Sequence, residues 1–154
     1  MDIKQLIKFL VKAKISTYAS SGEERGKILE DGSKEFELKE GILRYRDRYF
    51  GYNPFYGQEI VFQKDIPLWG MNYYGKIISK RVLLKNVYKF LQSALKKVKK
   101  SYPFRGPKSF KKGNFKYTNK VKGTIKKFEG EETIFFKGEV IFRLIYHGGI
   151  IISK

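Results

Sequence analysis

An internal repeat constrains the fold of this chain more than any other feature of its sequence. The run at 41–51, GILRYRDRYFG, returns at 113–123 as GNFKYTNKVKG. The run at 55–64, FYGQEIVFQK, returns at 128–137 as FEGEETIFFK. Glycine, aromatic and glutamate positions are kept between the copies. A fixed offset of this kind indicates that one supersecondary unit occurs twice and that the two copies share a core.

Hydrophobic periodicity predicts one helix at the start of each copy. Apolar residues at 3, 6, 7, 10 and 11 predict a helix that ends near Lys14 and begins with a capping box of Asp2 and Gln5. A second apolar stripe at helical spacing, between residues 83 and 98, predicts a second helix with Ser79 as its cap. Residues 15–34 and the proline-bracketed segment 101–107 are expected to be loops.

Residues that alternate between apolar and polar predict the strands. We expect them near 35–40, 42–50, 58–64, 66–76, 114–121, 124–129, 132–137 and 139–147. The predicted fold class is α+β: an internally duplicated helix-plus-antiparallel-meander unit, with two helices packed on an antiparallel sheet or sheets in pseudo-two-fold symmetry. The chain is expected to form a single domain, 1–154, with repeat one at about 1–78 and repeat two at about 79–154.

Composition excludes several classes of chemistry. The chain has no cysteine and one histidine, which rules out disulfides and thiolate chemistry and makes a zinc site improbable. We therefore predict no metal ligands, no cofactor and no catalytic residue set. Because no apolar run approaches the ~20 residues of a membrane helix and no signal peptide is recognisable, we expect a cytoplasmic protein without a membrane partner. Abundant lysine with little glutamine fits a thermophile.

The positive charge is concentrated in one stretch. Residues 76–127 contain 18 Lys and Arg and no Asp or Glu, whereas the other 102 residues carry 15 basic and 15 acidic groups. This stretch is either a solvated face or a site for nucleic acid or another polyanion. The lysines that would form such a site are Lys85, Lys89, Lys96, Lys97, Lys99, Lys100, Lys108, Lys111 and Lys112.

Polar residues that interrupt the aromatic and apolar strands are the candidates for a small-ligand site. Asp47 shares a strand face with tyrosines, so it is either the partner of a tyrosine hydroxyl or a site residue. Other candidates are the polar positions where the two copies differ, and an arginine of the 101–107 loop that we expect at the rim, where it would favour an anionic ligand. The predicted ligand-binding residues are Tyr45, Asp47, Asn72, Tyr74, Arg105 and His147.

Other equivalent positions predict structural roles. Trp69 and Met71, with their counterparts Phe142 and Leu144, are expected in the core because they alternate with the polar series in both copies. Glu59 and Glu132 each follow shortly after a glycine, where a glutamate more often serves a strand edge or turn than catalysis.

Four runs carry a resemblance to a known family. They are RYRDRYFG at 44–51, WGMNYYG at 69–75, YPFRGP at 102–107 and YHGG at 146–149. The chain resembles an uncharacterised bacterial and archaeal family that is catalogued only as a domain of unknown function. Its members occur alone or behind an N-terminal helix-turn-helix module, which implies that the domain itself senses or binds something.

Three functions are compatible with these observations. The first is a non-enzymatic small-ligand-binding or sensing domain with its site between the repeats. The second is nucleic-acid binding through the acid-free stretch, where aromatic residues interleave with lysines. The third is an acid–base enzyme that uses Asp47 or Glu59 with His147. The sequence does not predict the oligomeric state.

Overall fold

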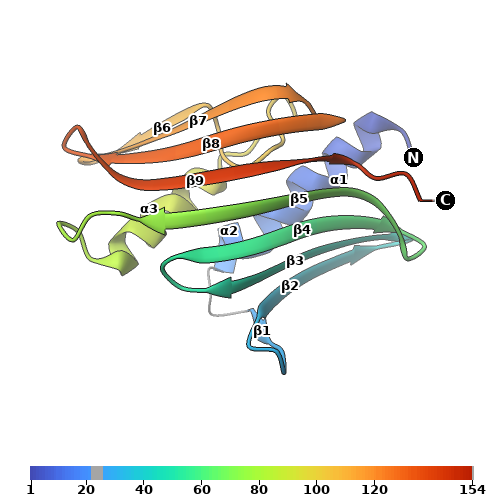
Figure 1. Ribbon diagram of the computed structural model, residues 1–154. Helices are drawn as coiled ribbons and strands as arrows, with labels where there is room; N and C mark the ends of the chain where they lie inside the picture. The colour runs from blue at the N-terminus through green and yellow to red at the C-terminus, as the bar shows by residue number, and fades with distance from the viewer. Residues whose placement is uncertain (22–25, 154) are drawn as a thin grey trace.

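The protein is one antiparallel sheet with its helices on one face (Figure 1). The computed structural model describes residues 1–21 and 26–153. The helices are α1 (Ile3–Ser16), α2 (Tyr18–Ser21) and α3 (Leu84–Leu95). The strands are β1 (Lys27–Ile28), β2 (Lys34–Glu40), β3 (Leu43–Gly51), β4 (Phe55–Gln63), β5 (Ile66–Ile77), β6 (Ser109–Lys112), β7 (Phe115–Thr124), β8 (Lys127–Phe136) and β9 (Glu139–Ile150).

The predicted fold class is wrong. Instead of two helix-plus-meander units, the structure has a single nine-stranded sheet in the order β1-β2-β3-β4-β5-β9-β8-β7-β6, with 52% strand and 20% helix. The β5 and β9 strands pair directly, so the backbone hydrogen bonds run without a break across the middle of the sheet. Pairing removes two exposed strand edges, each of which would leave a row of unsatisfied backbone groups.

Positions that correspond in the sequence repeat have corresponding strand partners. Asp47 lies opposite Glu59 in the β3–β4 pair, and Asn119 lies opposite Glu132 in the β7–β8 pair. All four of these polar side chains are buried. The strand pairing therefore places two carboxylates of the first half and an amide and a carboxylate of the second half on the covered face of the sheet.

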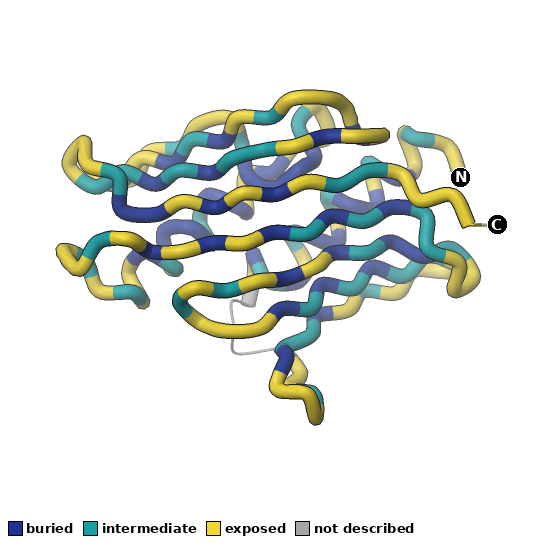
Figure 2. Tube along the Cα trace, viewed as in Figure 1, coloured by how far each residue is buried: buried dark blue, intermediate teal, exposed yellow. Residues whose placement is uncertain are grey.

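Burial alternates along the strands because one face is covered by helices and the other is open (Figure 2). The predicted core is confirmed: Trp69, Met71, Phe142 and Leu144 are all at most 2% exposed. The apolar sides of α1 and α3 pack on these residues, with Leu10 and Leu91 among the most buried side chains. Hydrophobic burial on this scale is the main favourable contribution to folding.

The helix boundaries differ from the predicted ones. Helix α1 runs to Ser16, and Asp2 makes no side-chain cap hydrogen bond, so the predicted capping box is wrong. Helix α3 begins only after Leu83. Ser79 lies four residues before that cap, and its hydroxyl accepts a hydrogen bond from the Arg81 N–H. The backbone N–H groups at both helix starts therefore lack the predicted side-chain acceptors.

Two short edge strands were missed and one strand was predicted in two pieces. Strands β1 and β6 close the two ends of the sheet, and β8 is continuous where a turn was expected near residue 130. The glycine at position 130 does not mark a turn but makes room inside β8 for the Tyr146 ring. A Cβ added at Gly130 would come within 2.2 Å of that ring. None of the helices in the described part of the chain has the length and apolar character needed to span a membrane.

Candidate functional site

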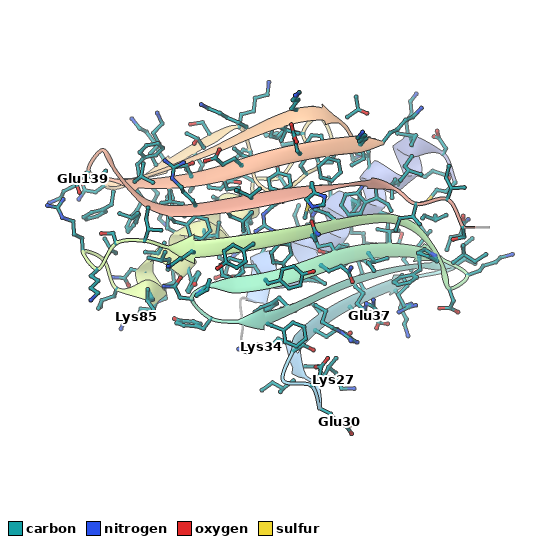
Figure 3. The ribbon with its side chains drawn as sticks, viewed as in Figure 1. Lys27, Glu30, Lys34, Glu37, Lys85 and Glu139 are labelled. Atoms are coloured by element: carbon teal, nitrogen blue, oxygen red, sulfur yellow. The ribbon has the colours of Figure 1, made fainter. Side chains whose placement is uncertain are left out.

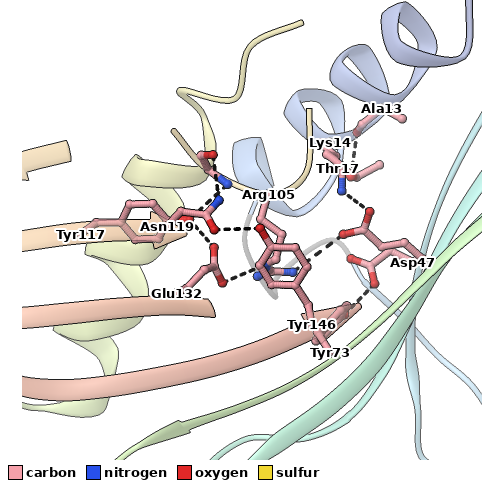
Figure 4. Close-up of polar contacts among 12 residues, drawn as sticks. Ala13, Lys14, Thr17, Asp47, Tyr73, Arg105, Tyr117, Asn119, Glu132 and Tyr146 are labelled. Atoms are coloured by element: carbon pink, nitrogen blue, oxygen red, sulfur yellow. Dashed lines mark hydrogen bonds and ion pairs between the residues drawn. The ribbon is translucent and has the colours of Figure 1, made fainter. Parts of the chain in front are cut away.

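A cluster of charged side chains is buried between the helices and the sheet (Figure 4). In the first half, Lys14 of α1 forms an ion pair with Glu59 of β4. The hydroxyl of Tyr73, on β5, donates a 2.6 Å hydrogen bond to Asp47 of β3. These groups share one space because α1 crosses the covered face of the strands that carry them.

Arg105 connects this group to the second half of the sheet. It lies in the loop that follows α3, and its Nε donates to a Glu132 carboxylate oxygen at 2.7 Å. Its guanidinium also lies 3.8 Å from Glu59 and stacks 4.8 Å from the ring centre of Tyr73. The hydroxyl of Tyr117 donates to the other oxygen of Glu132. Glu132, which is fully buried, is therefore satisfied on both oxygens.

Asn119 completes the polar layer of the second half. Its side-chain oxygen accepts a 2.7 Å hydrogen bond from the Tyr146 hydroxyl, and its amide nitrogen donates to the Gly106 carbonyl. The Gly106 N–H in turn donates to the Tyr117 hydroxyl. The loop that carries Arg105 is thus fixed by hydrogen bonds to the sheet, which holds the guanidinium in one place.

Burial and neighbouring charges change the acidity of this cluster. Burial, and then the nearby Glu59 charge, raise the pKa of the Asp47 carboxyl to about 7. Burial lowers the pKa of Lys14, although Glu59 opposes the change. Burial also disfavours the charged form of Arg105, but Glu132 and Glu59 more than offset it and raise the pKa of Arg105. Arg105 is therefore a permanent cation, whereas Asp47 titrates near neutrality.

A pocket opens beside the first-half cluster. Its empty volume is about 630 Å³ when the mouth is included, but the space that the centre of a water-sized sphere can reach is only about 50 Å³. The interior therefore suits a few waters or a small ligand. Its walls are Lys14, Thr17, Tyr18, Ala19, Tyr45, Asp47, Tyr49, Tyr52, Phe55, Glu59, Tyr73, Tyr88, Leu91, Leu95 and Arg105.

The structure divides the predicted ligand-binding residues between two faces. Tyr45, Asp47 and Arg105 line the pocket on the covered face. Asn72 and His147 lie opposite each other in the β5–β9 pair, and their side chains are on the open face. Asp47 and His147 therefore cannot belong to one ligand site, as the predicted set of six residues required, because strand side chains on different faces are separated by the sheet.

Tyr74 is also on the open face and is 53% exposed. With Asn72 and His147, it is separated from the pocket by the backbone of the sheet. An acid–base pair of His147 with Asp47 or Glu59 is excluded for the same reason, so the predicted enzyme arrangement is wrong.

Two further expectations about charged residues are wrong. Arg105 is not at the rim: it is buried and paired with Glu132, so it has no free charge for an anionic ligand. Glu59 and Glu132 are not at a strand edge or turn but in the interior of β4 and β8. The inward direction of Glu59 follows from its place between Gly57 and Val61, which are also buried.

Lys14 is a site residue that was not predicted. It follows Leu6 and Leu10 at intervals of four residues, so helical geometry places it on the same buried face. Glu132 and Asn119 were also missed, although they correspond to Glu59 and Asp47 in the repeat. The sequence signal that could have identified Glu132 and Asn119 was a charged or polar residue on an otherwise apolar strand face, at the same position in both copies.

All nine predicted polyanion-binding lysines are exposed. Lys85 lies at the start of α3 and is exposed to solvent (Figure 3). The nine lysines extend over α3, the following loop and β6, which is one edge of the sheet. Among the described residues, none of these lysines forms an ion pair with a carboxylate, so the whole edge keeps its positive charge.

The model of a family described as Domain of unknown function (DUF5680) matches residues 47–151, which is more than half of the chain. The chain belongs to this family. Comparison with curated proteins and with solved structures gave no match. The DUF5680 match confirms the resemblance to an uncharacterised family, while the bacterial or archaeal origin and the fusion to helix-turn-helix modules stay predictions.

The DUF5680 region contains most of the charged cluster. It begins at Asp47 and includes Glu59, Arg105 and Glu132, whereas Lys14 lies before it on α1. The family region thus supplies three carboxylates and one cation of the buried cluster, and the N-terminal helix supplies the second cation.

The acidity of Asp47 predicts that stability falls as pH rises. Its ordinary pKa of 3.8 increases to about 7 in the folded protein. Between these values the native state holds a proton that the unfolded chain has lost, so the free energy of unfolding should decrease by at most about 1.4 kcal/mol per pH unit. Urea unfolding from pH 4.5 to 7.5 measures this slope, and Asp47→Asn should become progressively more stable than wild type. Parallel curves for the two proteins would contradict the prediction, and Asp65→Asn, at an exposed carboxylate, is the control.

Proposed function

We propose that this DUF5680 protein is a non-enzymatic domain that binds a small ligand in the pocket between the helices and the first-half strands. The observation that carries the proposal is the pocket itself, whose floor holds Asp47, Glu59, Lys14 and Arg105. Sites for small molecules commonly combine aromatic and apolar walls with a few convergent polar groups. Elements from both halves of the chain line the pocket, since Leu91 and Arg105 belong to the second.

The cost of burying these charges supports a role beyond packing. Hydrophobic residues of similar volume are often as stabilising as buried ion pairs, or more so, because desolvation offsets the charge attraction. A core that only had to pack would have no use for five ionisable groups. A ligand that reaches the pocket would give the charged groups that line it a function.

The test is ligand-induced stabilisation with a blocked pocket as the control. Small amines, alcohols and carboxylates are screened at millimolar concentration for a rise in Tm. A ligand at 100 times its Kd should add about 2.7 kcal/mol, which for a chain of this size corresponds to roughly 5–10 °C. The variant Leu95→Trp fills the pocket wall and should abolish the rise, whereas Leu83→Trp, at an exposed position outside it, should retain the rise. An equal rise in both variants would place the binding elsewhere.

Polyanion binding is the second candidate, supported by the exposed lysines along α3 and β6. Its signature would be an affinity for single-stranded DNA that falls steeply with salt. Lys97→Glu combined with Lys100→Glu should weaken such binding and leave pocket binding unchanged. Affinity for DNA that is insensitive to salt and to these substitutions would exclude this function.

A further inference from the structure

The buried cluster contains one carboxylate more than its cations can neutralise. Lys14 pairs with Glu59, and Arg105 pairs with Glu132 while also lying 3.8 Å from Glu59. Asp47 forms no ion pair among the described residues, and it accepts a hydrogen bond from the neutral hydroxyl of Tyr73. It is only 7% exposed. A buried carboxylate without a cation carries a large desolvation cost, so it either takes up a proton or recruits a positive charge.

The walls around Asp47 are suited to a positive charge. Ring faces attract cations through their quadrupole, and the attraction increases when the cation is desolvated. In this pocket Arg105 already lies over the Tyr73 ring. The aromatic side chains that line the pocket are Tyr18, Tyr45, Tyr49, Tyr52, Phe55, Tyr73 and Tyr88.

The geometry points to a small organic cation, an ammonium ion with short alkyl substituents, as the ligand of this pocket, with Asp47 as its counter-ion and the tyrosine and phenylalanine rings as its walls. This inference rests on the proposed function, because it names the chemical class of ligand for that same pocket. The small interior sets the size: the charged group fits beside Asp47, and any longer chain has to extend toward the mouth.

Charge balance explains why a cation is preferred to an anion. Three carboxylates and two cations lie in the cluster, so an anion would add to an existing negative excess. When the pocket is empty, a proton on Asp47 makes the cluster neutral. When an ammonium ion enters, the proton leaves to solvent and the cluster is neutral again. The exchange is one cation in and one proton out, with no bond broken other than the O–H of Asp47.

Because the ligand cation replaces a proton on Asp47, binding depends on pH. The pKa of Asp47 depends in turn on the titratable groups that face it from neighbouring elements. These are Tyr73 from β5, Glu59 from β4, Lys14 from α1 and Arg105 from the loop after α3. Burial and the Glu59 charge favour the protonated carboxyl, while the other three groups favour the ionised form. Since the ligand binds the ionised form, its affinity should fall by up to tenfold for each pH unit below the Asp47 pKa.

The experiment uses the full chain and defined probes. Methylammonium and tetramethylammonium chloride are titrated by calorimetry and by backbone amide NMR, with tert-butanol as a neutral probe, acetate as an anionic probe and sodium chloride at matched ionic strength. We expect the two ammonium ions to shift the amides of Tyr45, Asp47 and Tyr73. Titrations at pH 6 in buffers of different ionisation enthalpy should show release of a proton, and the release should disappear by pH 8.5.

Substitution of the counter-ion gives the decisive comparison. Asp47→Asn keeps the size of the side chain and its acceptor for Tyr73, and it should weaken ammonium binding at least tenfold and abolish proton release. Asp65→Asn removes a negative charge from the exposed surface and should change neither. Equal affinity in wild type and Asp47→Asn, or an equal loss in Asp65→Asn, would overturn the inference.

The possible outcomes distinguish a wrong assignment of the ligand as a cation from a wrong assignment of the protein as a ligand-binding domain. If tert-butanol or acetate shifts the pocket amides and the ammonium ions do not, the cation assignment is wrong and the proposed ligand-binding function survives. If no probe of any charge shifts those amides, and the earlier screen finds no stabilising compound, both the assignment and the function are overturned.

Discussion

Replacement of Glu132 by alanine is expected to destabilise the protein by about 3–5 kcal/mol, because it leaves the buried Arg105 guanidinium without its closest carboxylate. Glu132 has no exposed surface and accepts hydrogen bonds from Arg105 Nε and from the Tyr117 hydroxyl. Removing the carboxylate thus leaves a charge and a hydroxyl unsatisfied in the core. Urea unfolding of the variant at pH 7 measures the effect.

The neighbouring residue supplies a matched control. Glu131 also pairs with an arginine, Arg143, but both side chains are about half exposed. Glu131→Ala should cost no more than about 1 kcal/mol, as expected for a surface ion pair. The double variant Arg105→Met with Glu132→Met should be more stable than Glu132→Ala, since it removes both charges. A cost for Glu132→Ala as small as that of Glu131→Ala would mean that water or another group takes over the partner's role.

Trp69→Ala is expected to lower the free energy of unfolding by about 3–5 kcal/mol, as for other buried large aromatic side chains. Trp69 has no exposed surface and stacks on Phe128, and its indole N–H donates a 3.1 Å hydrogen bond to the Ile125 carbonyl. Alanine would leave a cavity where α1 meets the central strands and would leave the Ile125 carbonyl without its donor. Chemical denaturation monitored by circular dichroism gives the measurement.

Tyr74 is the control for Trp69, since it lies five residues later in the same strand and on the open face. Tyr74→Ala should change stability by less than about 1 kcal/mol, because the ring is half exposed and its loss opens no cavity. Similar losses for the two variants would mean that the open face of β5 is covered by a partner under the conditions of the measurement.

Part of the candidate site was predictable from local pattern. The alternation of Tyr45, Asp47 and Tyr49 on one strand side predicted that Asp47 lies among aromatic rings, and the structure places it there with a hydrogen bond from Tyr73. The alternation also placed Asn72 and Tyr74 together. Alternation sorts the residues of one strand onto two sides, but it does not say which side of that strand faces the same way as a given side of another strand. It therefore could not show that Asn72 and Tyr74 lie on the opposite face of the sheet from Asp47.

The sequence by itself determined the two long helices, most of the strands, the core residues such as Trp69 and Phe142, and the membership of DUF5680. These depend on side-chain periodicity and on residue identity, which are local properties. Only the tertiary structure decided that β5 pairs with β9 to form one sheet and that Lys14 and Arg105, which are 91 residues apart, both reach Glu59. It also decided that Asp47 forms no ion pair within the described part of the chain. Such pairings depend on contacts between residues far apart in sequence, where burial, charge balance and backbone hydrogen bonds must be satisfied together.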